Sequence, residues 1–219
     1  MKIKGVVFDL NGTLIWDTPY HNQAFDIFLE KHNIRLSDEE KRTKIHGKTN
    51  PDIMRGIFER ELNEVEIRNF GIEKESIYQD LIISNLCFAE GVEDLFDYLK
   101  KAGIPFTIAT SSDLFNVDFY FREMKLERWF TREIVVYNDG TLKGKPEPDI
   151  FLRAASRLHL LPNELVIFED SNAGIIAAER AGAGKIIIVN SNNESYEDFS
   201  LDTITDFKQI DLSLFENKF

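Results

Sequence analysis

An acidic string near the N-terminus, Asp9-Leu-Asn-Gly-Thr13, has the residue types of a ligand site. Asp9 follows an apolar run, and the carboxyl ends of parallel strands are where open α/β sheets bind ligands. Gly12 allows a sharp backbone turn there, and the hydroxyl of Thr13 is offered to an anion. The same residue types are also common in turns, and we interpret the later string Asp139-Gly-Thr141 in that way.

Three further polar groups follow along the chain and favour a site over a simple turn. They are a hydroxyl string at Thr110-Ser111-Ser112, a lysine held between a glycine and a proline at Lys145, and adjacent carboxylates at Glu169-Asp170. The hydroxyls and the acidic pair follow predicted strands, at the edge where such sheets bind ligands, which favours a site over isolated turns.

The apolar pattern of the chain supplies the strands that would position these groups. Four short runs rich in β-branched and aromatic residues are apolar almost throughout, as in strands covered on both faces, and predict a parallel sheet: Val6–Leu10, Phe106–Thr110, Val166–Glu169 and Ile186–Val189. Each of the first three runs ends at one of the polar groups.

Helical segments alternate with the later strands, which is the α/β pattern. The predicted helices are Glu93–Lys101, Leu114–Met124, Asp149–His159 and Ala173–Ala181. Gly103 and Gly182 are placed as C-terminal caps, and Ser171 is placed as an N-cap.

Residues 17–86 show helical periodicity with no strand between the helices. Thr18-Pro19 predicts one helix start with Thr18 as N-cap, Ser37 with Glu40 predicts a capping box, and Asn50-Pro51 opens a third helix. We expect a catalytic core at residues 1–16 and 87–219, with an inserted helical cap at residues 17–86. The predicted fold class is α/β, with a Rossmann-like parallel sheet.

The four polar groups and their order resemble those of the haloacid dehalogenase-like superfamily. The strings Lys145-Pro-Glu-Pro-Asp-Ile-Phe and Phe168-Glu-Asp-Ser-Asn-Ala-Gly-Ile, with a helical cap after the first motif, resemble the branch that contains β-phosphoglucomutase and phosphoglycolate phosphatase. The resemblance covers essentially the whole chain.

The resemblance implies a role for each motif. Asp9 would attack the substrate phosphorus and form an aspartyl phosphate, with Lys145 screening the charge between them. The hydroxyl of Ser111, beside that of Ser112, would hydrogen-bond a phosphoryl oxygen. A helix N-cap is the alternative role for Ser111.

The resemblance also implies a Mg²⁺ cofactor. Its ligands would be the carboxylates of Asp9 and Asp170, the main-chain carbonyl of Asn11, and Glu169 acting directly or through water. Haloacid dehalogenation needs no metal, so the acidic pair argues against that chemistry.

Asn11 departs from the pattern of this branch, which has a second aspartate there as general acid–base. An amide does not titrate in this range, and loss of a general acid–base typically costs about 10²–10⁴-fold in rate. Three explanations stay open: substrates with good leaving groups, another proton carrier such as His21, or a chain that is slow, inactive or an altered form.

The segment His46-Gly47-Lys48-Thr49-Asn50 falls where this branch has its substrate-specificity loop. β-Phosphoglucomutase has a lysine before the glycine and an arginine a few residues after it; here these places are His46 and Asn50, and Lys48 is shifted. Gly47 and Lys48 are predicted to contact substrate. This loop has fewer basic residues that could bind a second phosphate, which argues against a mutase that handles a bisphosphate.

The charge and cysteine content narrow the possible partners. The net charge of −12 disfavours nucleic acid, no apolar run is long enough to span a bilayer, and the single Cys87 fits a reducing compartment. We expect a cytoplasmic monomer that acts on a small phosphorylated metabolite. The predicted function is a Mg²⁺-dependent phosphatase; the alternatives are a sugar phosphomutase and a catalytically impaired protein that binds phosphorylated ligands.

Overall fold

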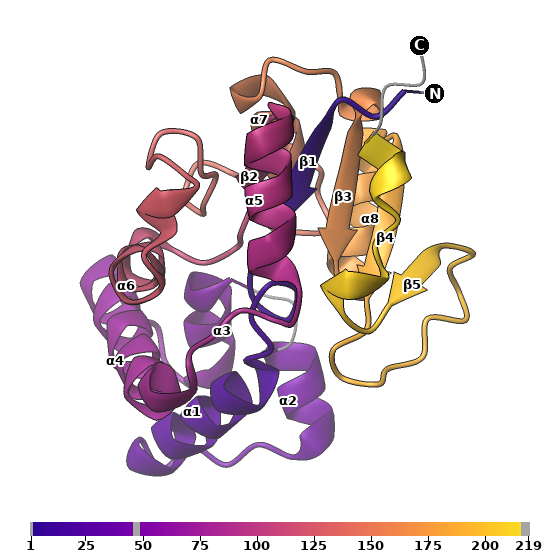
Figure 1. Ribbon diagram of the computed structural model, residues 1–219. Helices are drawn as coiled ribbons and strands as arrows, with labels where there is room; N and C mark the ends of the chain where they lie inside the picture. Colours follow the sequence, from indigo (N-terminus) through magenta and orange to yellow (C-terminus); the bar gives the residue numbers. More distant parts are fainter. Residues whose placement is uncertain (1, 46–48, 216–219) are drawn as a thin grey trace.

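A parallel five-stranded sheet forms the centre of the computed structural model, which describes residues 2–45 and 49–215 (Figure 1). Its strands are β1 (Gly5–Phe8), β2 (Phe106–Ile108), β3 (Leu165–Glu169), β4 (Lys185–Val189) and β5 (Asp202–Ile204), in the spatial order β2-β1-β3-β4-β5. All neighbouring pairs are parallel. The predicted α/β class is therefore confirmed.

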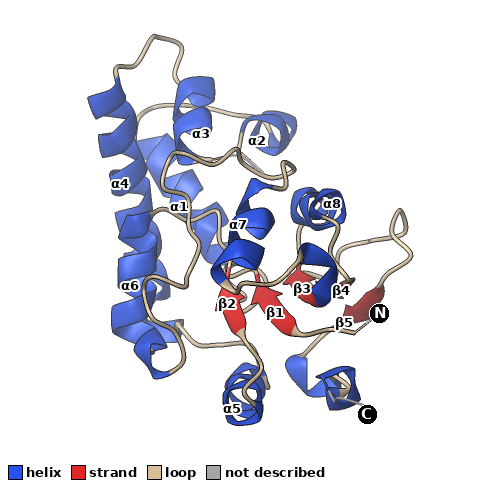
Figure 2. Ribbon diagram, turned by 90° about the horizontal axis from the view of Figure 1, so that it is seen from above, coloured by secondary structure: helices blue, strands red, loops and turns tan. Residues whose placement is uncertain are grey.

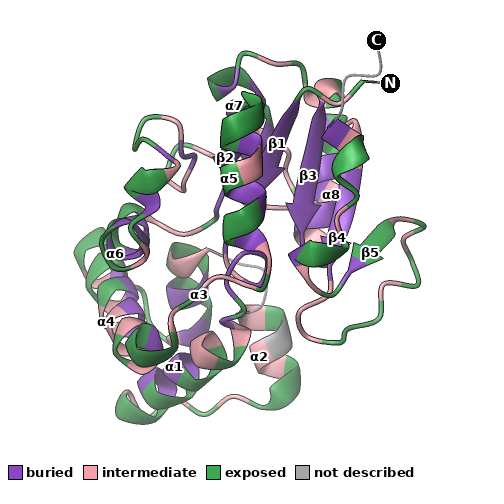
Figure 3. Cartoon of the chain, viewed as in Figure 1, coloured by how far each residue is buried: buried purple, intermediate pink, exposed green. Residues whose placement is uncertain are grey.

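Helices cover both faces of the sheet, as a parallel sheet requires (Figure 2). On one face lie α5 (Val92–Ala102), α6 (Leu114–Met124) and the short helices η4 (Phe207–Gln209) and η5 (Leu212–Phe215). On the other lie α7 (Asp149–Arg157) and α8 (Asn172–Ala181). The short helices η2 (Leu126–Arg128) and η3 (Pro162–Glu164) lie in connections. Strands β1 and β3 are wholly buried between the layers (Figure 3).

Aromatic packing on the α5 face fixes strand β1 against its neighbours. The ring of Phe8 stacks on that of Phe168 with centroids 5.0 Å apart, and it meets Phe96 of α5 edge to face at 5.2 Å. Each such pair contributes about 0.5–1.5 kcal/mol beyond area burial. Because Phe8 and Phe168 each precede an acidic residue, this packing also sets the spacing of the strand ends.

Four helices between β1 and α5 form a separate group, called here the helical insertion. They are α1 (Thr18–Lys31), α2 (Asp38–Lys44), α3 (Asn50–Ile57) and α4 (Glu64–Ile82), followed by η1 (Ile83–Asn85). Their apolar faces make a second core with its own members: Phe25, Phe28, Leu29, Ile45, Ile53, Met54, Ile57 and Ile67. In the described part of the chain, no helix combines the length and the apolar character needed to cross a membrane.

The predicted caps are largely confirmed, with one correction. Gly103 and Gly182 adopt left-handed conformations after α5 and α8, and Ser171 caps α8 by accepting from the backbone N–H of Gly174. Helix α1, however, has Asp17 and not Thr18 at its N-cap position. The Asp17 carboxylate makes no capping bond to α1, because it binds residues of the candidate site instead.

Candidate active site

Three carboxylates meet at the carboxyl edge of β1 and β3. Asp9 follows β1, Glu169 ends β3 and Asp170 comes next, and one oxygen of each lies within 4.8 Å of the others. The sequence therefore predicted their proximity correctly. The group is nearly closed off from solvent: Asp9 is 5% and Glu169 1% exposed.

Lys145 lies among these acids. Its ammonium donates to Asp9 Oδ1 at 2.5 Å and to Glu169 Oε2 at 2.7 Å. The loop before α7 carries this lysine, and its side chain is 8% exposed. A cation at this place lowers the free energy of negative charge on Asp9 and on any anion beside it.

The electrostatics of the cluster favour a bound dication. Burial raises the pKa of Asp9 to about 7 and the charge of Glu169 adds to the rise, although Lys145 opposes it. Burial, with the charges of Glu169 and Asp9, also raises the pKa of Asp170 well above its usual range. Three carboxylates and one ammonium sum to a formal charge of −2 when all are ionised (−3 + 1). Hard oxygen donors with this excess negative charge fit Mg²⁺.

Neighbouring residues fix the carboxylates of Glu169 and Asp170. Thr13 donates from its hydroxyl to Asp170 Oδ1 at 2.9 Å, and Ser171 donates from its N–H and hydroxyl to Glu169 Oε1 at 3.0 and 2.7 Å. Thr13 is completely buried and does not line the cleft described below. In this arrangement the hydroxyl of Thr13 orients a carboxylate, and its contact with a substrate anion stays a prediction.

The lack of a side chain at two glycines provides the space that these carboxylates occupy. A Cβ at position 12 would overlap the carboxylate of Asp170, and Gly12 also has a φ of +81°, which side-chain-bearing residues rarely adopt. A Cβ at Gly174 would overlap the carboxylate of Glu169. Both positions thus require glycine for the sake of the site.

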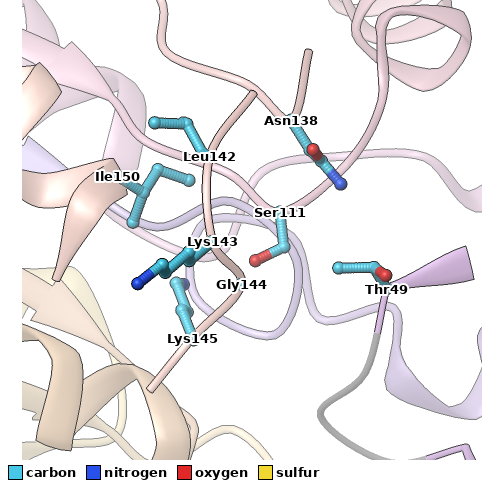
Figure 4. Close-up of a pocket in the computed structure, with 8 residues that line it drawn as sticks. All are labelled: Thr49, Ser111, Asn138, Leu142, Lys143, Gly144, Lys145 and Ile150. Carbon is cyan, nitrogen blue, oxygen red and sulfur yellow. The ribbon is translucent and has the colours of Figure 1, made fainter. Parts of the chain in front are cut away.

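The hydroxyl string after β2 divides into two roles. Ser112 donates to Asn11 Oδ1 at 2.8 Å. Ser111 lines a small pocket with Lys145, Gly144 and Thr49, where the helical insertion meets the core (Figure 4). Ser111 also lines the large cleft with Asp9, so its hydroxyl is placed for the predicted contact with an anion.

The side chain of Asn11 is held by hydrogen bonds on both ends. Its Nδ2 donates to Asp17 Oδ2 at 2.5 Å and to the hydroxyl of Tyr120 at 2.6 Å, and its Oδ1 accepts from Ser112 and, at 3.5 Å, from Thr110. These partners use both N–H groups and both lone pairs of the amide. Asn11 thus has no donor left for a substrate.

Two tyrosines extend this hydrogen-bonded group from the core into the helical insertion. Tyr78 of α4 donates to Asp17 Oδ2 at 2.5 Å, and its oxygen lies 2.8 Å from that of Tyr120 of α6. Since Tyr78 gives its proton to Asp17, Tyr120 donates to Tyr78. Burial raises the pKa of Asp17, but hydrogen bonds from His21, Tyr78 and Asn11 outweigh it and leave that pKa below its usual value.

His21 lies beside this group and lines the cleft. Its ring stacks on Tyr78 with centroids 3.8 Å apart, its Nε2 is 3.5 Å from Asp17 Oδ2, and its Nδ1 is 2.8 Å from the ammonium of Lys74. Lys74 also pairs with buried Glu75 at 2.9 Å.

A cleft of about 1150 Å³ lies over the acidic cluster, between the core and the helical insertion. Its floor includes Asp9, Asn11 and Lys145, and its opposite wall includes Arg68 and Gly71 of α4. The volume is ample for a small phosphorylated metabolite. The predicted substrate contacts of Gly47 and Lys48 lie outside the described residues.

The fold and site define a hydrolase of the haloacid dehalogenase-like family, and the chain belongs to that family, which it matches over residues 3–182. Hexitol phosphatase A of Escherichia coli is 32% identical over 191 residues, covering 87% of this chain and 85% of that protein. The phosphorylated carbohydrates phosphatase of Thermotoga maritima is 27% identical over 197 residues, covering 88% of each. A crystal structure of a HAD hydrolase, family IA, variant 3, from Entamoeba histolytica has a TM-score of 0.86 and 34% identity, covering 97% of both chains.

Sequence reasoning missed Asp17, Lys74, Tyr78 and Tyr120. Asp17 was treated as the residue before a helix, and the tyrosines are spaced like ordinary core positions of α4 and α6. Lys74 and Glu75 form a charged pair at a buried helix position, which is rare without mutual compensation. Adjacent opposite charges also occur at exposed positions such as Arg122 and Glu123, so the sequence alone gave no signal for this buried pair.

Proposed function

We propose that the chain is a Mg²⁺-dependent phosphatase that releases phosphate from a small phosphorylated carbohydrate through an aspartyl-phosphate intermediate. One observation carries this proposal: Asp9 lines a cleft and is held 2.5 Å from Lys145 within a cluster of three carboxylates. The names of the two phosphatases reported above support the choice of a phosphorylated carbohydrate as substrate.

In the first step, an oxygen of Asp9 forms a bond to the substrate phosphorus while the bond from phosphorus to the leaving oxygen breaks. Lys145 offsets the charge gathered between Asp9 and the phosphoryl oxygens, and Ser111 donates to one of them. Mg²⁺, held by Asp9, Asp170, Glu169 and the carbonyl of Asn11, would supply further charge neutralisation. Water then releases phosphate and regenerates the Asp9 carboxylate.

The leaving oxygen needs a proton from a group other than Asn11. An amide supplies none, and all four hydrogen-bonding positions of this side chain are already used. The three explanations given by the sequence make different predictions. Good leaving groups would predict fast hydrolysis of acyl phosphates and slow hydrolysis of esters, and proton transfer by His21 would predict that His21→Ala slows ester hydrolysis selectively. A slow or inactive protein would hydrolyse neither class.

We further propose that residues 17–86 act as a cap over residues 1–16 and 87–219. The cleft lies between these two parts, and residues of both line it. Movement of the cap would admit substrate and then exclude bulk water from the acidic cluster during phosphoryl transfer.

The test is phosphate release from hexitol phosphates, sugar phosphates and acetyl phosphate, with Mg²⁺ and with a chelator. We expect turnover that needs the metal and that is abolished in Asp9→Asn. The matched control is Asp80→Asn, an exposed acid of α4, which should keep full activity. Turnover retained in Asp9→Asn would refute the assignment of the nucleophile.

The fully bonded Asn11 also favours a second candidate, a protein that binds phosphorylated ligands without turnover. In that case, Mg²⁺ with a phosphate analogue would raise the melting temperature while no phosphate appears from any of the substrates. Recovery of ester hydrolysis in Asn11→Asp would then show that only the acid–base group is missing.

A further inference from the structure

The loop of residues 190–201 joins β4 to β5 and leaves the sheet at the same edge as the acidic cluster (Figure 1). Most residues of this loop are polar and exposed, but Tyr196 is half-buried between exposed neighbours. Its hydroxyl donates to the main-chain oxygen of Asp170 at 2.5 Å. A tyrosine that turns inward usually brings its hydroxyl to a hydrogen-bond partner. Tyr196 thus joins this loop to a residue of the candidate metal site.

The first half of the loop is held by Asn190, at the end of β4. The N–H of Asn190 donates to the carbonyl of Ile204 in β5 at 2.8 Å. Its side-chain amide then closes a ring with the main chain of Glu194, to whose carbonyl it donates at 3.0 Å and from whose N–H it accepts at 2.9 Å. Glu194 precedes Tyr196 by two residues, so this ring restrains the segment that carries the tyrosine.

The bond from Tyr196 fixes the peptide unit that joins Asp170 to Ser171. At one end of this unit, the N–H of Ser171 donates to Glu169 Oε1 at 3.0 Å. At the other end, the carbonyl of Asp170 accepts from Tyr196. Because a peptide unit is planar, the two bonds together oppose its rotation. The hydroxyl of Thr13 holds Asp170 Oδ1 at 2.9 Å, so the main chain and the side chain of Asp170 are both restrained.

We propose that Tyr196 is a positioning residue of the Mg²⁺ site: its hydroxyl holds the main chain of Asp170 and so directs the Asp170 carboxylate toward the ion. This inference rests on the proposed function, in which Asp170 binds Mg²⁺. Replacing a group that orients a metal ligand typically lowers metal affinity by about 10–100-fold. Mg²⁺ demands nearly ideal octahedral geometry, whereas Ca²⁺ accepts a flexible arrangement of oxygen ligands. Loss of the Tyr196 hydroxyl should therefore weaken Mg²⁺ binding much more than Ca²⁺ binding.

The variant Tyr196→Phe tests this role because it removes the hydroxyl and keeps the ring. Binding of Mg²⁺ and of Ca²⁺ is measured by calorimetry on the whole chain without substrate. We expect the dissociation constant for Mg²⁺ to rise by roughly 10-fold or more, and that for Ca²⁺ to stay within about 2-fold. Retained Ca²⁺ binding in the same sample shows that the acidic cluster is still folded.

Asn192→Ala is the matched control in the same loop. Asn192 donates to the hydroxyl of Thr18 at 3.3 Å and so attaches the loop to α1. This variant loses that bond and should keep the bond from Tyr196, so its affinity for Mg²⁺ should stay within about 2-fold of the unaltered protein. Asn190→Ala opens the ring that precedes Tyr196 and should weaken Mg²⁺ binding less than Tyr196→Phe does.

Equal Mg²⁺ affinity in Tyr196→Phe and the unaltered protein would overturn the positioning role. An equal loss for both metals, or the same loss in Asn192→Ala, would overturn it as well. Phosphate release is measured separately at saturating Mg²⁺. Its absence would refute the phosphatase and not the positioning role, because calorimetry reports on the metal alone. Absence of Mg²⁺ binding by the unaltered protein would overturn both.

Discussion

Replacing Gly174 by alanine should weaken the protein even though alanine is the better helix former. Gly174 lies in the first turn of α8, and in a helix interior alanine is favoured over glycine by up to about 1 kcal/mol. The added Cβ, however, would overlap the carboxylate of Glu169. That carboxylate must move, and it then loses its bonds from Ser171 and Lys145.

Each hydrogen bond to a charged group contributes about 1.5–3 kcal/mol, and overpacking of a buried site costs about 1–3 kcal/mol. Losing part of the hydrogen-bond energy and adding part of the overpacking cost, minus the gain in helix propensity, leaves a net destabilisation of roughly 2–4 kcal/mol. For a chain of this length, that corresponds to a melting temperature lower by roughly 5–15 °C. Because Glu169 belongs to the candidate metal site, the Mg²⁺ concentration for half-maximal activity should rise at least 10-fold.

The matched control is Gly56→Ala in α3. Gly56 is exposed and its added Cβ would meet no atom within 4 Å, so only the helix gain of about 0.5–1 kcal/mol should remain. Urea and thermal unfolding of both variants, with and without Mg²⁺, measure the contrast. The steric argument fails if Gly174→Ala is as stable as Gly56→Ala and keeps its response to Mg²⁺.

Three other substitutions probe the hydrogen-bonded group and the cation. Asn11→Asp should raise ester hydrolysis by roughly 10²–10⁴-fold. The new carboxylate would lie against that of Asp17, and this contact raises the pKa of the new carboxyl in the folded protein. The melting temperature relative to the unaltered protein should then fall as pH rises from 5 to 8, and a constant difference would contradict the contact. Lys145→Met should reduce phosphate release at least 10²-fold at saturating Mg²⁺; full activity would remove the lysine from the mechanism. Tyr120→Phe leaves the buried polar partners of its hydroxyl without a hydrogen bond and should cost about 1–3 kcal/mol in urea unfolding. Tyr98→Phe, which loses no hydrogen bond to any residue that the structure describes, should cost far less.

The strands and their polar ends could be predicted because they depend on local patterns. An apolar run followed by an acid predicts a buried strand with a carboxylate at its edge, and parallel pairing then brings Asp9 and Glu169 together. Strand β5 was missed because Asp202–Ile204 is three residues long and only Ile204 is buried. An edge strand of this kind has no apolar run to mark it.

The surroundings of Asn11 could not be predicted because they depend on how helices are rotated against one another. Tyr78 and Tyr120 belong to α4 and α6, 42 residues apart, and each occupies a position that also suits an ordinary core residue. Their hydroxyls meet only if α4 and α6 turn the faces that carry these tyrosines toward each other at the same height above the sheet edge. A single sequence indicates each apolar face but not the rotation that joins two of them.

Hydrogen bonds between α4 of the helical insertion and α6 of the core form a seam at one side of the cleft. On the α4–α6 side, Tyr78 bonds Tyr120, Gln79 donates to Asn116 at 2.9 Å, and Asn116 donates to Glu75 at 2.7 Å. A rigid-body rotation of the insertion that keeps these bonds must use the contact between α4 and α6 as its hinge.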